Sequence, residues 1–398
     1  MRISSNYIAQ LFIDSQNQQE SNLALLQQQI TTGLKFSQPS QDPVAASQVL
    51  SLQATLDQTA QYTTNANLAQ SRLSIEDSTL GSVTNTLQSI RSLALQAANA
   101  TQTTETRATI ATQISQQLKN LMQLANTQDG SGQYLFSGAA TSTVPFSQTG
   151  AGVIYNGTQS QRLVQIGSNQ TVADSDSGAA VFQQIRNGNG TFVASAASTN
   201  TGSAILGANS VTNPAGWAAG SPPYTIAFST PAAYTVTDST GATVQTGAYT
   251  DGQALAFGGA QLQFDGTPAA GDTFSVAASS NQDMFTTLQN LVTALATSSA
   301  AGQPAAVNGI NRAIEAIDQS LTNVSTVRSQ VGSRLTAIDS QTTSSSSLTL
   351  ALKSTMSNLR DLDYASAITK LNQQITGLQA AQASYVKMQH LTLFNYIQ

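Results

Sequence analysis

The chain has 398 residues, of which only 9% are charged, and its net charge is -5 with a pI near 4.7. Such a chain has no basic surface that could neutralise a series of phosphates, so we expect neither nucleic acid nor an anionic membrane as a partner. Cysteine is absent, which excludes disulfides, thiolate nucleophiles and cysteine-based metal sites.

The N-terminal stretch contains no continuous apolar segment and no small-residue cleavage site; it reads MRISSNYIAQLFIDSQNQQ. No run of about eighteen apolar residues occurs in the chain. The sequence therefore predicts neither a cleaved signal peptide nor a membrane-spanning helix.

A long helix is predicted to begin at Pro43, because Asp42 can cap its free backbone donors and proline is tolerated in a first turn. Small, apolar and acidic residues then alternate in steps of three and four, which is the spacing of a coiled-coil seam. The seam consists of Ala66, Ala69, Leu73, Glu76, Leu80, Val83, Leu87, Ile90, Ala94 and Ala97.

A second helix follows an interruption at 99–104 and ends before the turn sequence 129–132. Its hydrophobic positions are Ile110, Ile114, Leu118, Leu121 and Ala125. Residues 134–172 and about 178–281 are instead rich in Gly, Thr, Ala and Pro, with short alternating runs and Gly-containing turns. They predict a β-hairpin region and a small inserted all-β domain.

The three-four spacing returns near the other end of the chain, from Ile310 to Ile338. The simplest partner for the first seam is this second one, so we expect a mainly α fold with a β insertion. Its long antiparallel, coiled-coil-like bundle would be built from both chain ends. If the two helices align so that Leu50 lies near residue 350, Glu76 and Arg328 would lie about one turn apart. We predict that these two charged side chains pair. The alternative is that both extend to the surface and contact only water.

Both terminal segments carry hydrophobic side chains at helical spacing, and each is too short to bury them alone. We therefore expect subunit interfaces there, with copies of the chain packed into a ring or helix. The predicted interface residues are Ile3, Tyr7, Ile8, Leu11, Phe12, Leu23, Leu26 and Ile30 near the N-terminus, and Ile368, Leu371, Ile375, Leu378, Tyr385, Met388, Leu391 and Phe394 near the C-terminus.

These patterns divide the chain into three predicted domains. Residues 1–40 with 358–398 form a terminal helical assembly segment, and residues 41–177 with 282–357 form the helical bundle with its β-hairpin region. Residues 178–281 form the inserted β-rich outer domain.

No catalytic, cofactor or metal motif occurs, and we predict a protein that is not an enzyme and needs no cofactor. The single histidine, His390, is interpreted as a helix-surface residue, and Asp361 and Asp363 as caps of the following helix. Trp217 is interpreted as a core residue of the β domain, with a stacking site for a ligand as the alternative.

Several stretches resemble the flagellins and their junction relatives, namely MRIS, QITTGLKFSQPSQDPVAAS, QYTTNANLAQSRLSIEDSTL and LQSIRSLALQAANAT. The resemblance continues through LMQLANTQDGSGQYLFSGAAT and the last forty residues, and covers roughly 250 residues at both ends. Within that superfamily, GQYLFSG and LTLFNYI look like the hook-filament junction proteins rather than flagellin. Residues 178–281 match no pattern of the family.

The resemblance implies an extracellular structural component of the bacterial flagellum. Its partners would be further copies of the chain in a ring, the first hook-filament junction protein, flagellin and a chaperone of the flagellar type III export apparatus. It also implies export without a cleaved signal peptide. Two alternatives remain: a flagellin filament subunit, and a secreted carbohydrate-binding or carbohydrate-degrading protein that uses the β insertion.

Overall fold

The computed structural model describes residues 5–99, 101–150, 152–296 and 303–390. Its helices are α1 (Ser5–Thr32), α2 (Pro43–Ala98), α3 (Thr104–Ala125), the π-helix η1 (Ala179–Gln183), α4 (Pro214–Ala219), α5 (Met284–Ala296), α6 (Gln303–Arg360) and α7 (Tyr364–His390). None of the helices described has the length and hydrophobicity needed to span a membrane.

The strands all lie between α3 and α5 in the chain and pair antiparallel. They are β1 (Phe146–Thr149), β2 (Gly152–Tyr155), β3 (Leu163–Gly167), β4 (Gln170–Ala173), β5 (Ile185–Arg186), β6 (Phe192–Ala196), β7 (Ile205–Val211), β8 (Tyr224–Thr230), β9 (Ala233–Thr237), β10 (Thr243–Ala248), β11 (Ala254–Phe257), β12 (Ala260–Asp265), β13 (Thr273–Ala278) and β14 (Asn281–Gln282).

The chain forms two compact units, to which α2 and α6 both contribute. The terminal unit comprises residues 1–64 and 341–398, and the central unit comprises residues 65–340. The fold is mainly helical with a β insertion, as the sequence predicts. The predicted domain boundaries at 40, 177, 281 and 357 stay predictions.

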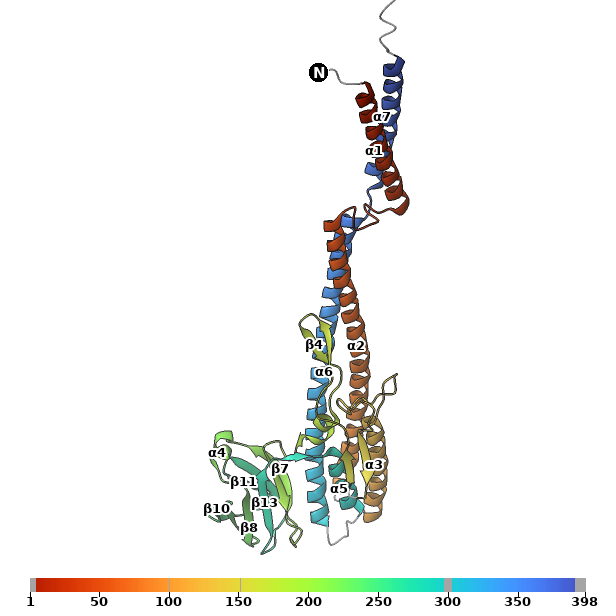
Figure 1. Ribbon diagram of the computed structural model, residues 1–398. Helices are drawn as coiled ribbons and strands as arrows, with labels where there is room; N and C mark the ends of the chain where they lie inside the picture. The colour runs from red at the N-terminus through yellow and green to blue at the C-terminus, as the bar shows by residue number, and fades with distance from the viewer. Residues whose placement is uncertain (1–4, 100, 151, 297–302, 391–398) are drawn as a thin grey trace, which may run out of the picture. The chain divides into compact units, whose positions relative to one another are not determined.

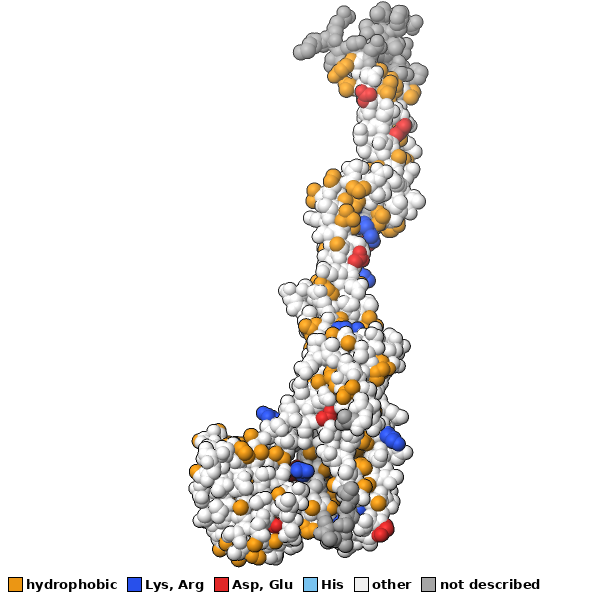
Figure 2. Space-filling model, turned by 60° about the horizontal axis from the view of Figure 1, so that its bottom comes forward, with side chains coloured by type: hydrophobic (Ala, Val, Ile, Leu, Met, Phe, Trp, Pro, Cys, Tyr) orange, Lys and Arg blue, Asp and Glu red, His pale blue; other side chains and the backbone are white. Residues whose placement is uncertain are grey.

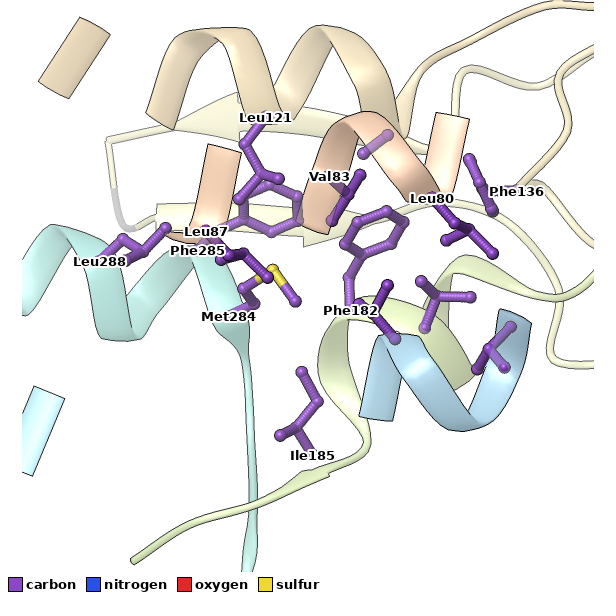
Figure 3. Close-up of a cluster of buried hydrophobic side chains, with 14 of the residues drawn as sticks. Leu80, Val83, Leu87, Leu121, Phe136, Phe182, Ile185, Met284, Phe285 and Leu288 are labelled. Carbon is purple, nitrogen blue, oxygen red and sulfur yellow. The ribbon is translucent and has the colours of Figure 1, made fainter. Parts of the chain in front are cut away.

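The helical core of the central unit is built on the predicted seam. All ten seam residues of α2 between Ala66 and Ala97 are buried, and so are the five predicted positions of α3. On α6 every seventh residue from Ile310 to Ile338 is buried, which matches a heptad seam. Figure 3 shows Leu80, Val83 and Leu87 meeting side chains from α5 and from the π-helix η1.

Aromatic rings close this core beside the hairpin region. Phe182 lies 5.3 Å from Phe136, 5.4 Å from Phe146 and 5.7 Å from Phe285, measured between ring centroids. The hairpins β1–β2 and β3–β4 pack against the helices through Phe146 and other buried side chains. Residues far apart in the chain are thereby joined in one cluster.

The inserted β domain has its own core. One sheet has the strand order β10-β9-β8-β13-β6, the other has the order β11-β12-β7, and aromatic side chains from both sheets form one buried cluster. Gly258 and Gly259, both with positive φ, form the two-residue turn between β11 and β12. The short ladder of β5 with β14 joins the chain entering the domain to the chain leaving it (Figure 1).

In the terminal unit α1 and α7 run antiparallel, since Phe12 stacks on Tyr385 and Gly33 lies beside Tyr364 (Figure 1). Gly33 ends α1 with a φ of 72°, and a Cβ there would lie 2.8 Å from the Tyr364 hydroxyl. Two backbone hydrogen bonds join the segment that follows α1 to the segment that precedes α7. One runs from the Lys35 N–H to the Arg360 carbonyl and the other from the Leu362 N–H to the Gly33 carbonyl. At the start of α2, the Asp42 carboxylate accepts from the Ala45 N–H at 2.9 Å, which is the predicted cap.

Candidate assembly interface

The α1–α7 pair buries little of its hydrophobic surface. Phe12 and Tyr385 are stacked with ring centroids 4.0 Å apart and planes at 3°. Other predicted interface residues of the two helices are only half-buried. They are Leu23, Leu26, Ile30, Leu371, Ile375 and Leu378. Among the side chains described on the two helices, Ala367 alone is fully buried. The pair therefore has a seam but no enclosed core.

Other predicted interface residues face away from the pair. Tyr7 is 60% exposed, Leu11 is 52% exposed and Ile368 is 46% exposed. Ile3, Leu391 and Phe394 lie outside the described residues, as do the side chains of Ile8, Met388 and His390. The subunit interface stays a prediction. The predicted interface side chains that the structure describes are all exposed or half-buried.

The sequence reasoning missed a second group of exposed hydrophobic side chains in the same unit. They are Ile13, Leu25, Val44, Leu50, Leu348, Leu350, Tyr364 and Val386. Figure 2 shows hydrophobic side chains on the surface of this unit, with few charged groups on the visible face. Among the residues whose burial is described, most of the exposed large hydrophobic side chains belong to the terminal unit, and an exposed surface of this kind marks an interaction site.

Asp363 caps α7, as the sequence predicts, because its carboxylate accepts from the N–H groups of Ala365 and Ser366 at 3.1 and 3.3 Å. Asp361 is not a cap of α7. A hydrogen bond from the Ser357 side chain, and then one from the Arg360 guanidinium at 3.2 Å, hold the pKa of Asp361 below its usual value. The two carboxylates thus have structural partners of their own.

The predicted pair of Glu76 and Arg328 is wrong. Arg328 pairs with Asp77 at 2.9 Å, whereas the Glu76 carboxylate accepts from the backbone N–H of Asp176 at 3.0 Å. The register was also misjudged, since Arg91 pairs with Asp318 and Gln70 with Asp339. The pair fails for another reason: Arg328 lies beside this turn of α2 but reaches the half-exposed Asp77, whereas the Glu76 side chain is buried in the core. The real alignment of the two helices is displaced from the assumed one by roughly one and a half to two and a half turns.

The β insertion is attached to α6 by a polar stripe. Asn308 accepts from the Leu206 N–H at 2.7 Å, Asn311 donates to the Leu206 carbonyl at 2.9 Å, and Glu315 accepts from Asn209. The two asparagine contacts satisfy the backbone N–H and carbonyl of Leu206 in β7, which is an edge strand of its sheet. Burial raises the pKa of Glu315, and the hydrogen bond from Asn209 opposes that rise. We call Asn308, Asn311 and Glu315 the docking stripe.

Trp217 belongs to the core of the insertion, as predicted, with Phe192 at 5.2 Å and Tyr224 at 5.7 Å between ring centroids. In the part of the chain that the structure describes, no group of three or more His, Asp or Glu residues could hold a metal ion.

Comparison with known proteins connects this geometry to a family. Residues 3–141 match the family model described as the bacterial flagellin N-terminal helical region, and residues 314–397 match the bacterial flagellin C-terminal helical region. The flagellar hook-associated protein 3 of Escherichia coli strain K12 is 25% identical over 370 residues, which is 92% of this chain and 90% of that protein. The match to the protein of the same name from Salmonella typhimurium is 29% identical over 46% of this chain and spans only 58% of the relative.

Solved structures agree with the sequence matches. A crystal structure of FlgL from Xanthomonas campestris is 32% identical, with a TM-score of 0.72, and the similarity covers 77% of this chain and 99% of that one. Flagellar hook associated protein-3 from Legionella pneumophila is 28% identical, also with a TM-score of 0.72, over 77% of this chain and 98% of that one.

Proposed function

Since the chain belongs to the family of flagellar hook-associated protein 3 (FlgL), we propose that it forms a ring of subunits that joins the hook to the flagellin filament. The chain is a structural protein of the flagellar hook-filament junction and not an enzyme. In the proposal, one side of the ring contacts the first hook-filament junction protein and the other side contacts flagellin.

The observation that supports the proposal is the exposed hydrophobic surface of the terminal unit. Tyr7, Leu11 and Ile368 would be buried only if further helices packed around the α1–α7 pair. Each such side chain contributes about 1.5–3 kcal/mol when it is fully buried. Copies of the same chain and of related subunits would supply those helices in a ring, since an interface repeated head to tail gives a ring when its rotation closes.

The test introduces a charge on this surface. Tyr7→Asp combined with Leu11→Asp should abolish swimming when it replaces the wild-type gene, leave hooks intact and release flagellin into the medium. The purified monomer should keep its unfolding midpoint, because both side chains are exposed already. The matched control is Val244→Asp, a change at a side chain that is 43% exposed in the β insertion, and it should leave attachment of the filament unchanged.

Normal filaments on cells that carry the Tyr7→Asp and Leu11→Asp changes would contradict the proposal. Loss of the filament without flagellin in the medium would instead favour a role as the filament subunit, because deletion of flagellin leaves nothing to be released.

The proposal includes the route to the junction. The chain would pass through the flagellar type III export apparatus without removal of an N-terminal signal, bound beforehand by an export chaperone at α7. The half-buried Leu371 and Leu378 of α7 offer the apolar face that such a chaperone requires. Leu371→Asp with Leu378→Asp should reduce the amount of secreted protein, and N-terminal sequencing of the secreted wild type should begin at the encoded start.

A further inference from the structure

A buried carboxyl group occupies the centre of the central unit. Glu76 of α2 is 0% exposed, and its Oε1 accepts a hydrogen bond from the backbone N–H of Asp176 at 3.0 Å. Its second oxygen, Oε2, has no hydrogen-bond partner among the described residues. A buried carboxylate that lacks partners is costly, whereas the neutral acid is tolerated far better.

A network of ionisable side chains adjoins Glu76, and of these Asp176, Arg334 and Arg72 act on its charge directly. The network consists of Arg72 on α2, Asp129 after α3, Arg162 before β3, Asp174 and Asp176 after β4, and Arg334 on α6. We call these six residues with Glu76 the buried charge cluster. Asp77, next to Glu76 in the chain, pairs with Arg328 outside the cluster.

The charges of the cluster balance only when Glu76 is neutral. Arg72 pairs with Asp129, Arg162 with Asp174, and Arg334 binds both oxygens of Asp176 at 2.9 Å. Each guanidinium thus already has a carboxylate of its own, and an ionised Glu76 would be a fourth negative charge with no cation left to pair with it. The Asp carboxylates of these pairs are 8% exposed or less, so water screens them little.

The electrostatics agree with this count. The pKa of Glu76 is raised from 4.5 to about 8, chiefly by burial and in addition by the nearby Asp176 carboxylate. The hydrogen bond from the Asp176 backbone and the charges of Arg334 and Arg72 act in the opposite direction without cancelling the rise.

We propose that a proton on Glu76 is part of the folded central unit, where it keeps the loop 174–177 seated between α2 and α6, and that loss of this proton in alkaline solution loosens the loop. The loop carries Asp174 and Asp176, and it lies between the hairpin β3–β4 and the π-helix η1. Its release would therefore detach the hairpin region from α6 while the apolar seam of α2 stays buried.

The direction of the pH dependence follows from linkage. The folded state keeps the Glu76 proton between pH 4.5 and about 8, while the unfolded chain has lost it. The stabilisation is complete below pH 4.5. It is lost as the pH rises from 4.5 to about 8, and over that range the equilibrium constant for unfolding or opening grows by up to about tenfold for each pH unit.

Hydrogen exchange of the full-length monomer tests the proposal. After correction for the intrinsic exchange rate, the peptide that contains residues 174–177 should lose protection about tenfold between pH 7 and 9 in the wild type. Glu76→Gln keeps the shape and the acceptor oxygen but cannot ionise, so its protection should not change with pH. Glu315→Gln is the matched control, since it removes another carboxyl group of raised pKa in the same unit and should leave the response of the loop intact.

An identical loss of protection in Glu76→Gln would overturn the proposal. A second measurement needs no stable variant: infrared difference spectra of the wild type at pH 6 and 9 should show loss of a protonated carboxylic acid between these values. A folded protein in which every glutamate has ionised by pH 6 would refute the inference as well.

Discussion

The two units of the molecule contain the same kind of long helix and differ in what surrounds it. In the central unit the seam of α2 meets α3, α5, α6 and the hairpin region, and its side chains are fully buried. In the terminal unit α1 packs against α7, and among the described residues hydrophobic side chains such as Tyr7 and Leu11 remain exposed. A coiled-coil pattern therefore predicts a helix, but the number of neighbours decides whether that helix is stable alone.

The difference also separates two functions of hydrophobic residues. Apolar side chains in the central unit stabilise the monomer, whereas those in the terminal unit would contribute only after assembly. Three changes in the isolated chain test that separation.

The largest effect is expected in the core of the central unit. Phe182→Ala should lower the free energy of unfolding of the monomer by about 3–5 kcal/mol, because it removes a fully buried ring that contacts three others. Urea denaturation followed by circular dichroism measures the change. Leu95→Ala, at a side chain that is 48% exposed on α2, is the control and should change stability by no more than about 0.5 kcal/mol. Equal losses in both variants would mean that this core is not the main source of stability.

An intermediate effect is expected at the docking stripe. Combined Asn308→Ala and Asn311→Ala changes leave the N–H and carbonyl of Leu206 without partners, which should reduce the free energy of opening β7 by about 1–3 kcal/mol. Hydrogen exchange in β7 measures this, with the exposed Gln330→Ala on the same helix as the control. Unchanged protection of β7 would show that the hydrogen bonds do not hold the insertion on α6.

The smallest effect is expected in the terminal unit. Phe12→Ala removes the stacked ring on Tyr385, yet it should alter the unfolding of the central unit in dilute solution by less than about 0.5 kcal/mol. Amide exchange in α1 and α7 should already be fast in the wild type. Strongly protected amides in both helices of the wild-type monomer would break the comparison, because the terminal unit would then be stable alone.

The helices and their buried faces could be predicted because small and apolar residues recur at fixed spacing over many turns. The register of α2 on α6 could not, since a repeating seam fits almost as well after a shift of one or two turns. The partner of Arg328 was misassigned because the half-exposed Asp77, next to Glu76 in the chain, takes the pair while the Glu76 side chain is buried. Glu76 was placed correctly in the seam, but its contact comes from the loop residue Asp176, a hundred positions away.

The docking stripe was missed for a different reason. Asparagine and glutamate on a long helix usually indicate a solvent-exposed face, and nothing local to Asn308 or Asn311 reveals that an edge strand lies against them. The exposed Leu50 and Leu350 were also not recognised as surface residues, because isolated leucines on a helix indicate core in most contexts.

The ladder of β5 with β14 has a consequence for how this chain can vary. Arg186 pairs with Asn281, so the peptide enters and leaves the insertion at neighbouring points, about 5 Å apart as in any antiparallel pair. A module joined through so narrow a base can be exchanged for another, or replaced by a tight turn, without altering the path of α5 and α6. The same two positions would accept a foreign domain for display on the cell surface.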